Sequence, residues 1–166
     1  MKNLDLISLT VPTRDGEFIA SYSTDGLATV AFPSGGKPGR SKVVPAKIRG
    51  WHRLTSAALK ATLAGRPLKK LPPLDLSIGT AFQQRVWGVL RKIRCGRTLS
   101  YAEVARAIGS PGAARAVGGA CGANPIPVLV PCHRVLAAHR KLGGFSGGLR
   151  WKVTLLQREG AVVSPG

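Results

Sequence analysis

Hydrophobic and polar positions in the first half of the chain predict a hairpin and one helix. Two β-rich runs within residues 17–32 flank the turn Thr24-Asp25-Gly26, a pattern typical of an antiparallel hairpin. Apolar side chains then recur at helical spacing from Trp51 to Leu63, and a glycine and a proline just beyond them end this helix. Residues 33–50 are rich in glycine, proline and basic residues, so we expect a loop there with at most one short strand.

Helix starts are marked more clearly in the second half. The capping-box segments Thr80–Gln83 and Ser100–Glu103 each begin a run with apolar residues every three to four positions. Gly109 ends the second of these helices, and Ser110-Pro111 is expected to begin the next one, with serine as the N-cap and proline at the first helical position. Two short helices joined by a tight turn that contains glycine are typical of a helix-turn-helix.

A proline-rich connection divides the chain into two predicted parts. Leu71-Pro72-Pro73-Leu74 favours an extended backbone, which places a boundary after residue 73. We therefore expect an α/β N-terminal subdomain over residues 1–73. A mostly α-helical C-terminal domain over residues 74–166 would carry the helix-turn-helix. Within this second domain, the apolar run from Ile126 to Val130 predicts a short buried strand, and Trp151 to Arg158 a helix.

Charge changes the picture of what this fold binds. The chain has 25 lysines and arginines against 7 aspartates and glutamates, a net charge of +18. Such an excess destabilises a compact fold by self-repulsion, which a polyanionic partner relieves. The basic residues recur along the whole chain and are not confined to one tail, so we favour nucleic acid as the partner over a merely basic surface.

The cysteines and the apolar segments exclude several other classes. Cys95, Cys121 and Cys132 are unevenly spaced and form no C-x-x-C pair, which argues against a disulfide framework and a zinc site. No apolar stretch approaches the ~18 residues of a membrane span, and the N-terminus shows no signal peptide. We expect an intracellular protein with reduced thiols, cytoplasmic and nucleoid-associated or nuclear, without metal or cofactor and monomeric.

The predicted second helix of the helix-turn-helix has an unusual composition. Residues 112–120 carry one long side chain, Arg115, among glycines, alanines and one valine. Glycine inside a helix costs up to about 1 kcal/mol relative to alanine. Small side chains let a backbone approach a flat or narrow surface closely, with Arg115 as the group that reaches out. A buried, tightly packed helix with one arginine extended to solvent explains the composition equally well.

Cys132 is the candidate nucleophile, because it follows an apolar run and precedes His133 and Arg134. A free thiol is only a few per cent thiolate at pH 7, so a nearby base or positive field must activate it. Neighbouring residues on an extended chain point in opposite directions, so a Cys–His pair needs a turn or an intervening water. Of the seven acids, Glu159 is the best candidate to orient the histidine. The dipeptide alone favours a structural cysteine.

Four sequence blocks together resemble the O6-alkylguanine-DNA alkyltransferase family. They occur in the family's order and extend almost continuously over residues 74–159. The blocks are Gly79-Thr80-Ala81-Phe82-Gln83-Gln84-Arg85-Val86-Trp87, Ser100-Tyr101, Ala113-Ala114-Arg115-Ala116-Val117-Gly118, and Asn124-Pro125-Ile126-Pro127-Val128-Leu129-Val130-Pro131-Cys132-His133-Arg134-Val135.

The resemblance implies a single-turnover DNA repair protein in which Cys132 takes the alkyl group from O6-alkylguanine. His133 would deprotonate the thiol through a water while Glu159 orients the imidazole. Tyr101 would donate a proton to N3 of the leaving guanine, and Asn124 would brace the turn that holds the cysteine. The implied partner is double-stranded DNA, bound through its minor groove.

The resemblance also implies the fold and the contacts with DNA. The N-terminal part would resemble a ribonuclease-H-like sheet, and Arg115 would enter the base stack in place of an extruded nucleotide. Phe145 stands where many relatives carry tyrosine, and the N-terminal half has no cysteine for the structural zinc of some relatives. The residues expected at DNA are Ser100, Ala114, Arg115 and Gly118, and those at the flipped base are Val135, Phe145 and Ser146.

Three other functions are open on the sequence. A non-catalytic lesion-binding protein would flip alkylguanine without reacting, although relatives of that kind replace the acceptor cysteine. A helix-turn-helix transcription factor would read a sequence in the major groove and form no covalent product. A Cys-His hydrolase is chemically possible, but the sequence shows no recognisable substrate site for one.

Overall fold

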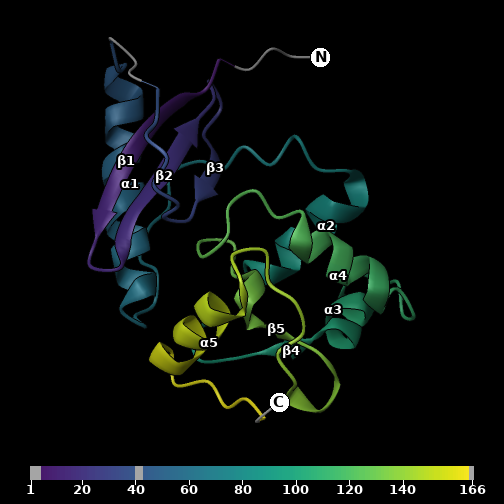
Figure 1. The fold of residues 1–166 in the computed structure, drawn as a ribbon. Helices are drawn as coiled ribbons and strands as arrows, with labels where there is room; N and C mark the ends of the chain where they lie inside the picture. Colours follow the sequence, from purple (N-terminus) through teal and green to yellow (C-terminus); the bar gives the residue numbers. More distant parts are fainter. Residues whose placement is uncertain (1–4, 40–42, 165–166) are drawn as a thin grey trace.

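The computed structural model describes residues 5–39 and 43–164. Figure 1 shows a sheet and one long helix side by side in the N-terminal part, and shorter helices gathered in the C-terminal part. In chain order the elements are β1 (Ile7–Thr13), β2 (Gly16–Tyr22), β3 (Leu27–Ala31), α1 (Ala46–Leu63), α2 (Ala81–Leu90), β4 (Leu99–Ser100), α3 (Tyr101–Ala107), α4 (Ala114–Gly122), a 3-10 turn η1 (Cys132–Arg134), β5 (Val135–Leu136), a second 3-10 turn η2 (Ala138–Arg140) and α5 (Leu149–Arg158). None of the described helices is long and apolar enough to cross a membrane.

The N-terminal sheet is antiparallel, with the order β1-β2-β3. The hairpin predicted within residues 17–32 is confirmed, because β2 and β3 pair across the turn at residues 23–26. The sequence did not reveal β1. Only Val11 of this strand is buried, so the alternation that marks a half-buried strand is weak there.

The first helix begins earlier than predicted. Residues 46–50 were expected to belong to a loop, but α1 starts at Ala46. Pro45 precedes it with φ −56°, a value that proline fixes in advance and that suits the entry to a helix. The predicted end is confirmed, since α1 stops at Leu63 and Gly65 takes φ +71°. Residues 40–42 of the predicted loop lie outside the described residues.

Both predicted capping boxes are present, at the starts of α2 and α3. Gly109 follows α3 with φ +73°, which ends that helix as expected. The predicted start of the next helix is wrong. Instead of beginning at Ser110-Pro111, α4 begins at Ala114, because Gly112 takes φ +90° and breaks the helical path.

The apolar run before Cys132 is buried but is not a strand. Residues 126–130 form a turn in place of the predicted extended segment. All five are buried, as expected. The Val130 N–H donates to the Ile126 carbonyl at 2.9 Å, and Val128 takes φ +74°, a left-handed value that costs about 1 kcal/mol or more for a β-branched residue. Asn124 stabilises this turn: its amide donates to the Val130 carbonyl (2.8 Å) and its carbonyl accepts from the Ile126 N–H (3.0 Å).

The two parts of the chain share one buried core. Hydrophobic residues of the sheet, α1, α2, α4 and α5 belong to a single cluster. Leu27 N–H donates to the Pro73 carbonyl (2.8 Å) and Asp75 N–H to the Leu27 carbonyl (2.8 Å), so the connection between the parts is itself attached to β3. Arg158 at the end of α5 makes two 2.8 Å hydrogen bonds to Asp15 beside β1. The boundary after residue 73 therefore remains a prediction.

An aromatic cluster joins the sheet to the loop before α5. Phe32 lies 5.1 Å from the ring centre of Trp151 and 5.8 Å from that of Phe145. Phe18 packs against both Phe32 and Trp151, with ring centres 5.5 Å apart in each case. A Cβ on Gly147 would lie 2.5 Å from the Phe32 ring, so this loop approaches the sheet closely enough to require glycine.

Candidate active site

Cys132 begins the short turn η1 and lies at the wall of a cavity of about 450 Å³. The side chain is nearly enclosed, with 4% of the residue exposed. The cavity is formed between α3, α4, the cysteine turn and the loop before α5. Its lining residues are Tyr101, Gly118, Cys121, Gly122, Cys132, Gly144, Phe145 and Ser146.

The turn η1 places His133 and Arg134 on Glu159, the residue that ends α5. His133 Nε2 lies 2.9 Å from Glu159 Oε1, and Arg134 donates from Nε and Nη2 to the two carboxylate oxygens at 2.9 and 2.8 Å. Arg134 Nη1 also donates to the Ile93 carbonyl at 2.6 Å. The Glu159 and His133 side chains are fully buried. One carboxylate therefore fixes both residues that follow the cysteine.

These contacts define the tautomer of His133. Burial by itself raises the pKa of Glu159, but the hydrogen bonds from His133 and Arg134 outweigh it and hold the pKa at about 2. Burial lowers the pKa of His133 against the opposing effect of that carboxylate, so the imidazole is neutral at pH 7. An ionised carboxylate accepts the proton of Nε2, which leaves Nδ1 as the basic nitrogen. Nδ1 is buried and has no hydrogen-bond partner among the described residues.

Burial raises the pKa of the Cys132 thiol above its ordinary value, although Asn124 and Lys152 oppose this. The resting thiol is therefore protonated at pH 7. Lys152 is fully buried in α5, and its ammonium donates to the carbonyls of Val135 (2.7 Å) and Gly144 (3.1 Å). It thereby joins the strand after the cysteine to the loop that lines the cavity. Burial lowers the pKa of Lys152 to about 8.

Comparison with known proteins agrees with this arrangement. Residues 81–161 match the family model for the DNA-binding domain of 6-O-methylguanine DNA methyltransferase. The crystal structure of Mycobacterium tuberculosis OGT in complex with DNA superposes with a TM-score of 0.74 and 40% identity, covering 91% of each chain. The chain belongs to the O6-methylguanine-DNA methyltransferase family. A family structure from Pyrococcus kodakaraensis, at 22% identity and a TM-score of 0.65, shares the fold.

Curated members of the family match over a shorter region. The methylated-DNA--protein-cysteine methyltransferase of Mycobacterium leprae is 52% identical over 101 residues, which cover 61% of each protein. The bifunctional transcriptional activator/DNA repair enzyme Ada of Escherichia coli is 48% identical over 99 residues, 60% of this chain and 28% of Ada. The matched region thus spans less than two thirds of these relatives' length. The small antiparallel sheet with helices is the architecture of the solved family members.

Several of the residues expected at the site meet at the cavity. Tyr101, Phe145 and Ser146 line it together with Cys132, and Gly118 adds the face of α4. Val135 does not line it: this residue is fully buried, its N–H donates to the Cys132 carbonyl and its own carbonyl accepts from Lys152.

Of the residues expected at DNA, Ala114, Arg115 and Gly118 lie on α4, and Ser100 is the N-cap of α3. Ala114 begins α4, and Arg115 beside it is exposed, with no side-chain partner within residues 5–39 and 43–164. Ser100 caps α3 by accepting a hydrogen bond from the Glu103 N–H at 3.1 Å. Its side chain therefore has a structural role in addition to any contact with DNA.

Sequence reasoning missed Lys152 and the position of Cys121. Lys152 falls on the same face of α5 as Leu155 and Leu156, so helical spacing alone could have predicted that it is buried. Cys121 lines the same cavity as Cys132, and burial raises its pKa to about 12. No local signal indicates that α4 brings this second thiol to the site.

Proposed function

We propose that the chain repairs alkylated DNA by direct reversal, moving the alkyl group of O6-alkylguanine onto Cys132. The observation that carries this proposal is the acceptor thiol at a cavity of about 450 Å³ with a buried His133–Glu159 pair directly behind it. A cavity of that size accommodates one flipped base, since small-molecule sites range over about 300–1,000 Å³. Because the thioether product is stable, each molecule reacts once.

The proton of the thiol leaves through His133. Since the thiol is protonated at rest, a base must take its proton as the sulfur attacks. Nδ1 of the neutral His133 is that base, reached through a water, and Glu159 stabilises the imidazolium that forms. A bond forms between Sγ and the alkyl carbon while the bond from that carbon to O6 breaks, and the electron pair of the broken bond stays on guanine.

Tyr101 supplies a proton to the leaving base. Burial raises the pKa of its hydroxyl, which is therefore protonated at pH 7 and able to donate to N3 of guanine. Main-chain groups of Ser146 hold the base edge, and Phe145 packs against it. Asn124 keeps the cysteine turn in place through its two hydrogen bonds.

DNA is bound through α3 and α4, which act as a helix-turn-helix laid against the minor groove. The small residues of α4 allow close approach, and the exposed Arg115 fills the gap left by the extruded nucleotide. The net charge of +18 supplies affinity through phosphates without reading sequence. The protein acts as a monomer, in the cytoplasm at the nucleoid or in the nucleus. Its sheet and α1 form a ribonuclease-H-like N-terminal subdomain that ends at residue 73.

Transfer of a labelled methyl group from O6-methylguanine DNA to protein tests the proposal. One equivalent of label should reach wild-type protein and the Cys95→Ala control, and none should reach Cys132→Ala. His133→Ala and Glu159→Ala should slow transfer by about 100-fold or more while DNA binding changes little, because general-base catalysis contributes at least that factor. Stoichiometric transfer in Cys132→Ala, or equal losses of transfer and binding in the other two variants, would contradict the assigned roles. An unchanged intact mass would identify a non-catalytic lesion-binding protein instead.

A further inference from the structure

A second hollow lies on the other side of the cysteine turn from the acceptor cavity. It measures about 570 Å³ and lies between the segment after α1, the end of α2 and the turn before η1. The two hollows share no lining residue. Pro131 and Arg134 face this one, whereas Cys132 faces the acceptor cavity. A ligand here would leave the acceptor cavity open.

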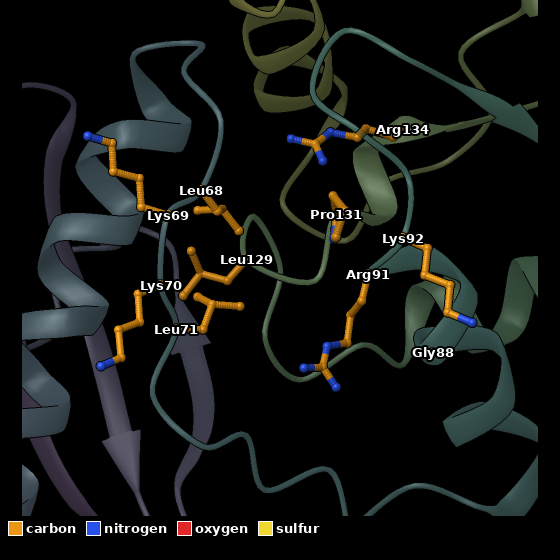
Figure 2. A pocket seen from close by; sticks show the side chains of 10 residues that line it. All are labelled: Leu68, Lys69, Lys70, Leu71, Gly88, Arg91, Lys92, Leu129, Pro131 and Arg134. Atoms are coloured by element: carbon orange, nitrogen blue, oxygen red, sulfur yellow. The ribbon is translucent and has the colours of Figure 1, made fainter.

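The hollow has basic rims and an aliphatic floor. Figure 2 shows Leu68, Leu71 and Leu129 gathered between Lys70 on one side and Arg91 on the other. Four basic residues, Lys69, Lys70, Arg91 and Lys92, are exposed at the rims. None of their side chains has an ion pair or hydrogen bond with another described residue. Arg134 belongs to the wall instead, since Glu159 and the Ile93 carbonyl already take its donors.

The basic surface continues beyond this hollow. Lys69 and Lys70 also line an adjoining hollow along α1, and that one shares Arg66 with a third hollow that includes Lys60. All seven acids of the chain lie among the described residues, and none of them lines any of the three hollows. Apart from Arg14 and Arg134, which pair with Asp15 and Glu159, the basic residues that line these hollows have no ion pair among the described residues. They form a track of positive charge that suits an extended polyanion.

The lining chemistry selects among polyanions. Proteins that hold single-stranded nucleic acid combine a basic groove with aromatic side chains on which bases stack. No aromatic residue lines the hollow of Figure 2. A phosphate backbone whose bases are already stacked and paired needs only the cations. A second copy of this chain is disfavoured, because two surfaces of a protein with a charge of +18 repel each other.

We propose that this surface, defined by Lys69, Lys70, Arg91 and Lys92, binds the phosphate backbone of a second DNA duplex. The protein thereby bridges two DNA segments, one on α4 and one on the far side of the cysteine turn. This inference rests on one part of the proposed function, namely that the first duplex binds at α4. Sequence-independent contacts of this kind hold neighbouring segments near one molecule and allow direct transfer between them.

Energy transfer between two short, lesion-free duplexes with different dyes tests the bridge at limiting protein. Wild-type protein should raise the signal, and the triple variant Lys70→Gln/Arg91→Gln/Lys92→Gln should lose it. The logarithm of the binding constant falls linearly with the logarithm of the salt concentration, and removing three phosphate contacts makes this slope shallower by about 2.7. Between 50 and 200 mM salt, wild-type bridging should therefore weaken about 40-fold more than any residual bridging by the variant. The matched control Lys47→Gln/Arg49→Gln/Arg53→Gln removes three exposed charges from α1, outside all three hollows.

The outcomes are separable from those of the proposed function. Methyl transfer from O6-methylguanine DNA is measured separately on the same protein preparations, and the triple variant should retain it. Equal bridging by the triple variant and wild type, or equal loss in the control, would overturn the inference. The inference would also be overturned if single-stranded RNA or an acidic polypeptide displaced the second duplex at a lower concentration than unlabelled duplex DNA does. Absence of methyl transfer by wild-type protein would refute the repair activity and leave the bridging result intact.

Discussion

Replacing Glu159 by glutamine removes a charge that two buried partners share. The Glu159 side chain is fully buried and accepts from His133 Nε2 and from two nitrogens of Arg134. Glutamine has nearly the same shape, but its amide group cannot accept at both oxygen positions. The variant leaves the Arg134 guanidinium, itself only 6% exposed, without a counter-charge.

The size of the effect follows from the pKa of this carboxyl. A value of about 2 in the folded protein, against an ordinary 4.5, corresponds to about 3 kcal/mol of stability at pH 7. Because the folded pKa is lowered, this stability is complete above pH 4.5 and is lost as the pH falls towards 2. About 2 kcal/mol of it should disappear between pH 6 and pH 3.

Urea unfolding, followed by tryptophan fluorescence at several pH values from 3 to 7, measures this dependence. The free energy of unfolding of Glu159→Gln should lie about 3 kcal/mol below that of wild type at pH 7, and the gap should narrow to about 1 kcal/mol at pH 3. Glu17→Gln, which alters an exposed carboxylate, should track wild type throughout. A gap that stays constant over this range would refute the assignment of Glu159 as the ionised partner of the network.

Three further changes have distinct expected results. Lys152→Met should lower the free energy of unfolding by about 2 kcal/mol in urea, since two buried carbonyls lose their donor. Gly147→Ala should cost about 1–3 kcal/mol through its clash with the Phe32 ring. Gly144→Ala, with open space at Cβ, should cost less than half of that, and equal costs would refute the close approach. Arg115→Ala should slow methyl transfer from a fully paired lesion more than from a lesion in single-stranded DNA, and Arg106→Ala on α3 should not show this difference.

Local signals in the sequence predicted those elements whose ends are fixed by nearby residues. The two capping boxes begin α2 and α3 because serine or threonine and its partner three residues later satisfy each other without help from the rest of the fold. Gly109 ends α3 for an equally local reason. The predicted start of α4 was wrong because Gly112 adopts a left-handed conformation, which a glycine permits but does not require.

Side-chain contacts that leave no periodic pattern decided what the sequence could not show. The apolar run before Cys132 looked like a strand, but Asn124 bonds both its ends and folds it into a turn. The contact between His133 and Glu159 was reached by elimination among seven acids, and the structure places the two side chains together. Arg134 is an additional partner of Glu159. It also donates to the Ile93 carbonyl, 41 positions away in the chain, a contact that no spacing rule detects.

The aromatic contact between Phe145 and Phe32 has a consequence for how such a protein changes over time. Phe145 lines the acceptor cavity, and the ring that supports it belongs to the N-terminal part, outside the residues 81–161 that match the family model. Substitutions behind Phe145 alter the width of the cavity without touching thiol, imidazole or carboxylate. The range of adducts accepted can therefore drift by changes in the sheet, while the chemistry of transfer is inherited unaltered.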